Sequence, residues 1–384
     1  MIYLDHNATS PLSPRSRATW LEAAERFPGN PSSPHRLGAR ADAALEQARQ
    51  RLASLLGCAP LDIVWTSGST EACNTVLHHA AAADPAAPAW IGAVEHPAVR
   101  ESARHHFRSR VDEIPVDARG VVDLDWLKDR LAAQRPALVA IMAANNETGV
   151  LQPWREAQEL CAGAGIPFFC DATQWCGRLP AQGLGACGFV AGSAHKFGGP
   201  RGVGFLKVPN AWPLRPLLWG GKQLEGRRAG TENVPGVLGM VAALEWCEEQ
   251  IAAGGNVQRL ALRERFQAAL QTAFPSVRLN GAGADRLWNT VSVVMPEADC
   301  RQRWVVKLDR AGFAVSTGSA CASGSEQPSH VLTAMGLSSR DASRALRFSS
   351  GWLTAEAEWN DLLKAMVRIQ EDFAVSAAAI PDAP

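Results

Sequence analysis

Lys196 has sequence neighbours that suggest a chemical role for its side chain. It follows the apolar run 189–192 and precedes the glycine-rich run 197–202, whose small residues leave room for a bulky partner. Most lysines lie on protein surfaces in contact with water, and that role stays open for this one. A lysine that enters a cleft and loses its hydration gives up its proton more readily. Its amine can then attack carbonyl carbons.

Two further segments place polar groups directly after predicted strands. The turn 66–71 joins a strand to a helix, where main-chain N–H groups and the helix dipole can stabilise a phosphate. Its Ser, Gly and Thr residues are also common helix caps, so the turn alone does not decide between the two roles. Asp171 ends a strongly apolar strand, where a carboxylate either caps the next turn or pairs with a buried cation.

The lysine, the carboxylate and the phosphate turn together fit one cofactor, pyridoxal phosphate. That group needs a lysine that binds it covalently, a carboxylate on its pyridine nitrogen and a cradle for its phosphate. The carboxylate keeps the ring nitrogen protonated, so that the ring can accept electrons from the substrate Cα.

The nine cysteines are an odd number scattered through the chain, which is not the pattern of a disulfide framework. They lack the paired spacing of a zinc site, so no metal is predicted. Most are expected to be small buried apolar residues. Cys321 differs because it lies in the glycine- and serine-rich run 316–325, which offers nothing large to pack against and is predicted to be a mobile loop.

The elements that must position these groups follow an α/β pattern. Apolar runs typical of strands alternate with helical patterns up to about residue 250, which predicts a mostly parallel sheet covered by helices. The predicted strands are 63–66, 89–94, 137–142, 166–171, 189–192 and 203–206, with a helix from Thr70 towards Ala82. The polar residues of interest follow the carboxyl ends of these strands, where open α/β sheets bind ligands.

The pattern of predicted helices and strands changes after about residue 250. A helix near 257–274, strands at 289–295 and 345–349, and a closing helix near 354–372 indicate a smaller α+β unit. We therefore predict a large domain, residues 16–250, and a small domain formed by residues 1–15 with 251–384, which carries the loop of Cys321.

Composition narrows the function further. The chain has 384 residues and a formal net charge of +0, which argues against binding nucleic acid or a membrane surface through bulk positive charge. No apolar run reaches the roughly 18 residues of a membrane span, and the first residues lack the basic and apolar regions of a signal peptide. The sequence thus predicts a soluble, cytoplasmic protein.

The order of the motifs resembles one known family. The chain is similar to the cysteine desulfurases of the NifS/IscS kind, in the class V aminotransferase group of fold-type I pyridoxal phosphate enzymes. The runs that carry the resemblance are 3–9, 29–33, 66–71, 95–99, 145–149, 171–174, 193–196, 227–233, 318–321 and 345–349. They occur in the family's order from residue 3 to about 350, so the resemblance covers nearly the whole chain.

The resemblance implies a role for each matching position. The catalytic residues would be Lys196, Cys321 and His96, with His96 stacked on the face of the cofactor ring. Residues that would bind the cofactor are Ser69, Thr70, His96, Asn146, Asp171, Gln174, Ser193, His195, Lys196 and Thr231. Asn146 and Arg347 would hold the substrate carboxylate, for which the planar guanidinium is well suited. Thr231 would reach the phosphate of a neighbouring subunit, which implies a homodimer.

The implied reaction turns L-cysteine into L-alanine and leaves the sulfur on Cys321 as a persulfide. The attacking species must be a thiolate, so a lowered pKa of Cys321 is expected near the cofactor. An acceptor protein, such as an iron–sulfur scaffold, would then receive the sulfur. Two alternatives stay open: another class V enzyme, such as an aminotransferase or a selenocysteine lyase, and a non-catalytic scaffold that binds sulfur-trafficking partners. Departures from the family pattern at Trp175, Lys222 and Trp352 remove no group that the chemistry needs, but they bear on the acceptor surface and on the shape of the pocket entrance.

Overall fold

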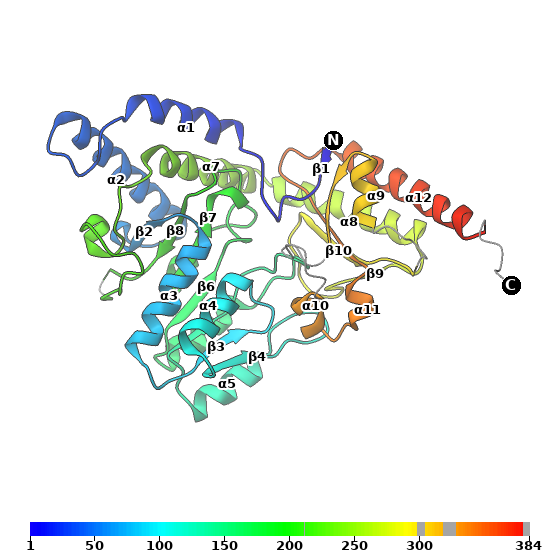
Figure 1. Cartoon of the computed structure of the whole chain (residues 1–384), viewed down its shortest axis with the longest axis horizontal. Coiled ribbons are helices and arrows are strands. Elements are labelled where there is room, and N and C mark those ends of the chain that lie inside the picture. The colour runs from blue at the N-terminus through cyan, green and yellow to red at the C-terminus, as the bar shows by residue number, and fades with distance from the viewer. Residues whose placement is uncertain (211, 298–303, 318–327, 379–384) are drawn as a thin grey trace.

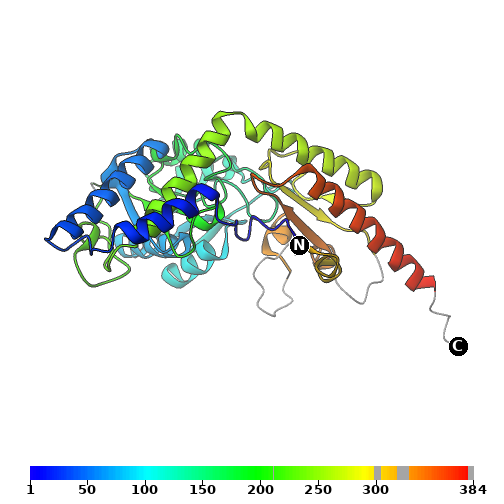
Figure 2. The ribbon, with the colours of Figure 1, turned by 90° about the horizontal axis from the view of Figure 1, so that it is seen from above.

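The computed structural model describes residues 1–210, 212–297, 304–317 and 328–378, with side chains described up to residue 371. Cys321 lies outside the described residues. Figures 1 and 2 show a larger group of helices and strands built from the first part of the chain, and a smaller group beside it. The N-terminal segment runs between the two, from β1 (Ile2–Tyr3) beside the smaller group to α1 (Pro14–Arg26) on the larger one.

A seven-stranded sheet forms the centre of the larger group. Its strands, in spatial order, are β2 (Ile63–Thr66), β8 (Gly204–Lys207), β7 (Phe189–Ser193), β6 (Phe168–Asp171), β5 (Leu138–Ala140), β3 (Ala89–Gly92) and β4 (Val111–Ile114). The strand β8 runs antiparallel to both β2 and β7, and the other pairs are parallel. Most of these strands are buried along their whole length, which explains why they read as continuous apolar runs.

Helices cover this sheet, and most of them begin at a side-chain cap. They are α1, α2 (Arg36–Leu56), α3 (Ser69–Ala83), α4 (Pro97–Phe107), α5 (Leu124–Ala133), α6 (Trp154–Gly163) and α7 (Val234–Ala252), with short 3₁₀ turns η1 (Pro60–Asp62), η2 (Leu184–Ala186), η3 (Ala194–Lys196) and η4 (Gln223–Gly226). Ser13 caps α1 and Asp123 caps α5, each accepting a main-chain N–H through its side chain. Among the described residues, no helix combines the length and the apolar character that crossing a membrane requires.

The smaller group contains a four-stranded antiparallel sheet in the order β12 (Ser316–Thr317), β13 (Ala345–Ser349), β10 (Thr290–Val294) and β9 (Arg278–Leu279). Around it lie α8 (Gly255–Ala273), α9 (Trp304–Arg310), α10 (His330–Ala334), α11 (Ser339–Ala342) and α12 (Glu356–Ala378). A parallel pairing of β1 with β11 (Phe313–Ala314) joins the N-terminus to this group. A separate apolar core here includes Phe266, Phe348 and Trp359.

The structure confirms the predicted fold class, an α/β protein with a mostly parallel sheet covered by helices. Each predicted strand is present to within three residues at either end, and the helix predicted from Thr70 is α3. The strand β4 was not predicted, because its half-exposed sequence Val111-Asp112-Glu113-Ile114 lacks a continuous apolar run. The division into residues 16–250 and residues 1–15 with 251–384 stays a prediction.

Candidate active site

A cavity of about 490 Å³ lies beyond the carboxyl ends of β6 and β7. Its lining includes every residue predicted to bind a cofactor except Thr231, namely Ser69, Thr70, His96, Asn146, Asp171, Gln174, Ser193, His195 and Lys196. Thr231 is exposed and does not line this cavity. The structure therefore brings together groups that are more than a hundred residues apart in the chain, at the edge of the sheet where ligands are expected.

One end of the cavity is suited to an anion. Gly68 precedes α3 with a φ of 152°, a region that favours glycine, and a Cβ there would come within 3.3 Å of the Ser193 hydroxyl. No side chain caps this end of α3, and its first residues, Ser69 and Thr70, line the cavity. Ser69 and Thr173 share a hydrogen bond between their hydroxyls at 2.6 Å.

Glu71, in the first turn of α3, is compatible with anion binding here because hydrogen-bond donors compensate the negative charge of its carboxylate. Its carboxylate accepts the Ser67 main-chain N–H at 2.7 Å and two hydrogen bonds from the Arg228 guanidinium at 2.9 and 3.2 Å. Burial alone would raise the pKa of Glu71, but the hydrogen bonds from Arg228 and Ser67 outweigh it and lower the pKa.

The Asp171 carboxylate ends β6 at the centre of the site. Its Oδ1 accepts the main-chain N–H of Thr173 at 3.0 Å and also a hydrogen bond from the Thr173 hydroxyl. Nearby, Gln174 donates through Nε2 to the main-chain oxygen of Asn7 at 2.9 Å. The Gln174 Oε1 atom is buried and has no hydrogen-bond partner among the described residues. A bound group that carries a donor would satisfy it, since an unpaired buried acceptor is costly.

The two histidines of the cavity are held in their neutral form. His96 is the N-cap of α4, where its Nδ1 accepts the Ala98 main-chain N–H at 3.1 Å. Burial lowers the pKa of His96, and the nearby Lys196 and His330 lower it further against the opposing charge of Asp171. Burial, followed by the positive charges of Lys196, Arg201 and Arg178, lowers the pKa of His195 to about 4.

Lys196 occupies the last position of the 3₁₀ turn that follows β7, and its side chain enters the cavity. Its Nζ donates to the main-chain oxygens of Asn7 and Ala8, both at 2.8 Å. The neighbouring His195 ring is hydrogen-bonded through Nδ1 to the Thr9 hydroxyl at 3.1 Å. The segment 7–9 thus contacts four of the predicted cofactor residues, namely Asn146, Gln174, His195 and Lys196, although no role was predicted for it.

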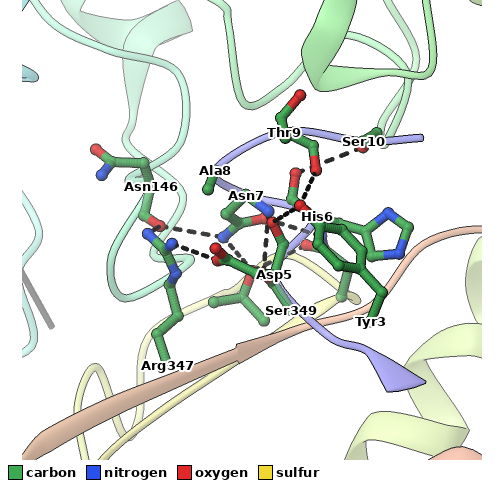
Figure 3. A network of polar contacts seen from close by, with 12 residues as sticks. Tyr3, Asp5, His6, Asn7, Ala8, Thr9, Ser10, Asn146, Arg347 and Ser349 are labelled. Atoms are coloured by element: carbon green, nitrogen blue, oxygen red, sulfur yellow. Dashed lines mark hydrogen bonds and ion pairs between the residues drawn. The ribbon is translucent and has the colours of Figure 1, made fainter. Parts of the chain in front are cut away.

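Arg347 lies in β13, away from the lining of the cavity, and is fully buried. Its Nη2 pairs with the Asp5 carboxylate at 2.7 Å, and its Nη1 donates to the main-chain oxygen of Asn146 at 3.0 Å (Figure 3). The predicted pair of carboxylate-binding residues, Arg347 and Asn146, is therefore in direct contact. Asp5, which compensates the buried positive charge, was not predicted.

Comparisons with known proteins bear on this arrangement. The family model described as "Aminotransferase class-V" matches residues 2–361. The chain belongs to this family. A cysteine desulfurase of Cereibacter sphaeroides is 40% identical over 379 residues, covering 97% of this chain and 96% of that protein. One from Klebsiella pneumoniae is 41% identical over 362 residues, covering 93% of this chain and 89% of that protein.

Solved structures agree with these relatives. A structure titled "NIFS-LIKE PROTEIN" is 32% identical, with a TM-score of 0.87, and covers 97% of this chain and 99% of its own. The predicted resemblance, the predicted fold type and the prediction of an enzyme with cysteine desulfurase activity are confirmed. The family depends on pyridoxal phosphate in general. The roles of the individual residues stay predictions.

The three departures from the family pattern lie outside the lining of the main cavity. Trp175 is buried and donates through its indole N–H to the Pro180 oxygen at 2.8 Å. Trp352 donates to the Gly177 oxygen at 2.8 Å and lines a second cavity, of about 260 Å³, that also touches Lys196. Lys222 is exposed. Both tryptophans thus donate an indole hydrogen bond to a main-chain oxygen and lie outside the lining of the main cavity.

Proposed function

We propose that the main cavity holds pyridoxal phosphate and that this chain uses it to take sulfur from L-cysteine. The observation that carries the proposal is the convergence of a lysine amine, a carboxylate and an uncapped helix N-terminus on one cavity at the carboxyl ends of the strands. The buried, unpartnered oxygen of Gln174 adds a polar position that a hydroxyl-bearing ring would fill.

Each part of the cavity has a proposed task. Lys196 would bind the cofactor covalently and Asp171 would pair with its pyridine nitrogen. His96, neutral at physiological pH, would stack on the ring. The phosphate would be bound by Ser69, Thr70, Ser193 and His195. The cofactor, when bound, supplies an electron-accepting ring that makes the substrate Cα–H bond acidic.

The remaining steps belong to side chains of this chain. Arg347 and Asn146 would hold the substrate carboxylate, and the Lys196 amine would carry the proton between the substrate Cα and the cofactor. The Cys321 thiolate would then attack the substrate sulfur. The carbon–sulfur bond breaks, a sulfur–sulfur bond forms, and a proton completes L-alanine. L-cysteine and the thiol of Cys321 become L-alanine and a Cys321 persulfide, so the step needs no outside oxidant.

The partners are proposed on the same basis. Thr231 is exposed and lies outside the cavity of its own chain. It would therefore complete the phosphate site of a second copy, which makes a homodimer the proposed assembly. A sulfur-acceptor protein, such as an iron–sulfur scaffold, would take the persulfide sulfur in the cytoplasm. Neither nucleic acid nor a membrane is a proposed partner, since the net charge is +0.

The test is to supply the purified protein with pyridoxal phosphate and L-cysteine and to quantify alanine, and sulfide in the presence of a reductant. Borohydride should fix the cofactor to Lys196, which peptide mass spectrometry would locate. Cys321→Ser should stay yellow and yield no sulfide. Equal sulfide from Cys321→Ser would remove this thiol from the mechanism. Amino-group transfer to a keto acid in place of sulfide release would indicate an aminotransferase.

A further inference from the structure

The N-terminal segment 5–9 lies between the two halves of the proposed site. On one side is the arginine that would hold the substrate carboxylate, and on the other is the cofactor lysine. Figure 3 shows this segment surrounded by polar contacts, with Arg347 and Asn146 on one side of Asn7. Asn7 is the residue of the segment whose hydrogen bonds reach both halves.

The side chain of Asn7 faces the carboxylate half. It is only 1% exposed, and its Nδ2 donates to the main-chain oxygen of Asn146 at 3.1 Å. The same oxygen accepts the Arg347 guanidinium at 3.0 Å. Asn7 and Arg347 therefore share one acceptor, and a displacement of Asn7 would change the position of Asn146 against Arg347.

The main chain of Asn7 faces the cofactor half. Its carbonyl oxygen accepts the Lys196 amine at 2.8 Å and the Gln174 amide at 2.9 Å. The next carbonyl, of Ala8, accepts the same lysine amine at 2.8 Å. These two carbonyls hold Lys196 by ion–dipole contacts in the cofactor-free protein.

Further hydrogen bonds fix the position of Asn7 relative to the small sheet. Its Nδ2 also donates to the Thr290 hydroxyl at 2.9 Å, and its Oδ1 accepts the Asn289 amide at 3.0 Å. Its main-chain N–H donates to the Ser349 hydroxyl at 3.0 Å. Ser349 lies in the same strand as Arg347, and Thr290 pairs with it in the adjacent strand.

We propose that Asn7 is a positioning residue that sets the Lys196 amine at a fixed place relative to the Arg347–Asn146 pair. The proposal deepens the proposed function, because it rests on the roles assigned there to Lys196 and Arg347. Proton transfer requires the substrate Cα and the amine to meet closely, and misplacement by about 1 Å can cost roughly 100-fold in rate. Asn7 would achieve this placement without touching the substrate.

The first test uses the cofactor-free protein, and so does not depend on activity. Asn7→Ala and the milder Asn7→Ser are treated with an amine-acetylating reagent at one fixed pH, and acetylation of Lys196 is followed by mass spectrometry. We expect Lys196 to react several-fold faster than in the parent protein, because the carbonyls that hold it are no longer anchored. Lys207, buried and donating to the Cys187 oxygen at 2.7 Å, is the internal reference and should not change.

The second test measures L-cysteine turnover by the cofactor-loaded variants. Both variants should lower kcat and raise KM, with a fall in kcat/KM of roughly 10- to 100-fold. Asn280→Ala is the matched control, because Asn280 is a buried amide that bonds to Ser292 in the small sheet. Its melting temperature should fall while Lys196 labelling and kcat/KM stay near the parent values.

Two results would overturn the proposal. One is unchanged Lys196 labelling in both Asn7 variants. The other is an Asn280→Ala variant that reproduces the changes at a similar loss of melting temperature, which would make the effect one of general stability. If the protein showed no sulfide release at all, the proposed function would fail, while the labelling result would still decide whether Asn7 holds the lysine.

Discussion

The two halves of the site are assembled in different ways. In the cofactor half, each group follows a strand of the seven-stranded sheet: Ser69 after β2, His96 after β3, Asp171 at the end of β6 and Lys196 after β7. In the carboxylate half, the pair Arg347–Asp5 joins residues 342 positions apart in sequence. Parallel strands bring their carboxyl ends to one edge automatically. The carboxylate half instead depends on individual long-range contacts.

The two halves also differ in how their charges are balanced. In the cofactor half, burial keeps both histidines neutral, and Lys196 is held by carbonyl dipoles. In the carboxylate half, the buried Arg347 is paired with a full negative charge on Asp5. A buried cation without such a partner would be very costly. A change of charge should therefore lower the free energy of unfolding less in the cofactor half than in the carboxylate half. In either half it should impair catalysis.

The largest effect should come from Lys196→Ala. It removes the amine that binds the cofactor and moves the proton, and we expect turnover of L-cysteine to fall at least about 1,000-fold. The melting temperature should change little, because Lys196→Ala removes hydrogen bonds to main-chain carbonyls of the N-terminal segment and leaves their backbone in place. Lys207→Met is the control, a buried lysine of the same sheet that lies outside the cavity, and it should retain activity. Turnover by Lys196→Ala near the parent rate would contradict the assignment.

Arg347→Ala should follow, with both stability and substrate binding affected. Removing the guanidinium leaves Asp5 without its counter-charge, and breaking such a buried pair costs about 2–5 kcal/mol. We expect KM for L-cysteine to rise roughly 100-fold and the melting temperature to drop. Asp5→Asn tests the comparison directly, because it should lose stability as well while keeping the cation that binds the carboxylate. A smaller rise in KM for Asp5→Asn than for Arg347→Ala is therefore required.

Gln174→Ala should have a smaller effect, confined to the cofactor half. It removes one hydrogen bond to the Asn7 carbonyl and the acceptor oxygen proposed for the cofactor, so affinity for pyridoxal phosphate should fall about tenfold. Equilibrium dialysis followed by absorbance would measure it. KM for L-cysteine, compared at saturating cofactor, should stay close to the parent value. An unchanged cofactor affinity would show that the Gln174 Oε1 atom does not contact the cofactor ring.

The smallest effect concerns Glu147, next to Asn146. Burial raises the pKa of Glu147 to about 7, despite a hydrogen bond from the Ser329 hydroxyl and the charge of Arg347. Its ordinary pKa is 4.5, so in the window between 4.5 and about 7 the unfolded chain releases a proton that the folded protein keeps. Its contribution to stability is complete below that window and is lost as the pH rises through it.

Glu147→Gln should flatten this dependence. Between pH 6 and 7, the parent should lose about 1 kcal/mol more of its free energy of unfolding than the variant. Urea unfolding at the two pH values measures the difference. Glu159→Gln, on an exposed face of α6, should behave like the parent. Identical slopes for Glu147→Gln and the parent would mean that Glu147 is ionised in the folded state.

The contrast between the halves also explains what the sequence could predict. Buried strands are visible as apolar runs, and polar residues directly after them, such as Asp171 and Lys196, belong to the edge that binds ligands. The contacts of Asp5 and Asn7 are not visible in this way, because they depend on how two sheets meet. The motif 3–9 was recognised, and its match was the one available signal for this segment. Cys321 lies outside the described residues, so its predicted role awaits experiment.

The contacts of the first nine residues have a practical consequence for work with this protein. Met1 is 84% exposed, so an affinity tag fused ahead of it has room to leave the surface without disturbing β1. Trimming the chain back past Thr9, by contrast, would strip away the carbonyls that hold the lysine and the acid that balances the arginine. A protein shortened in this way should have lost activity, so proteolysis near this end is to be checked before a loss of activity is assigned to a mutation.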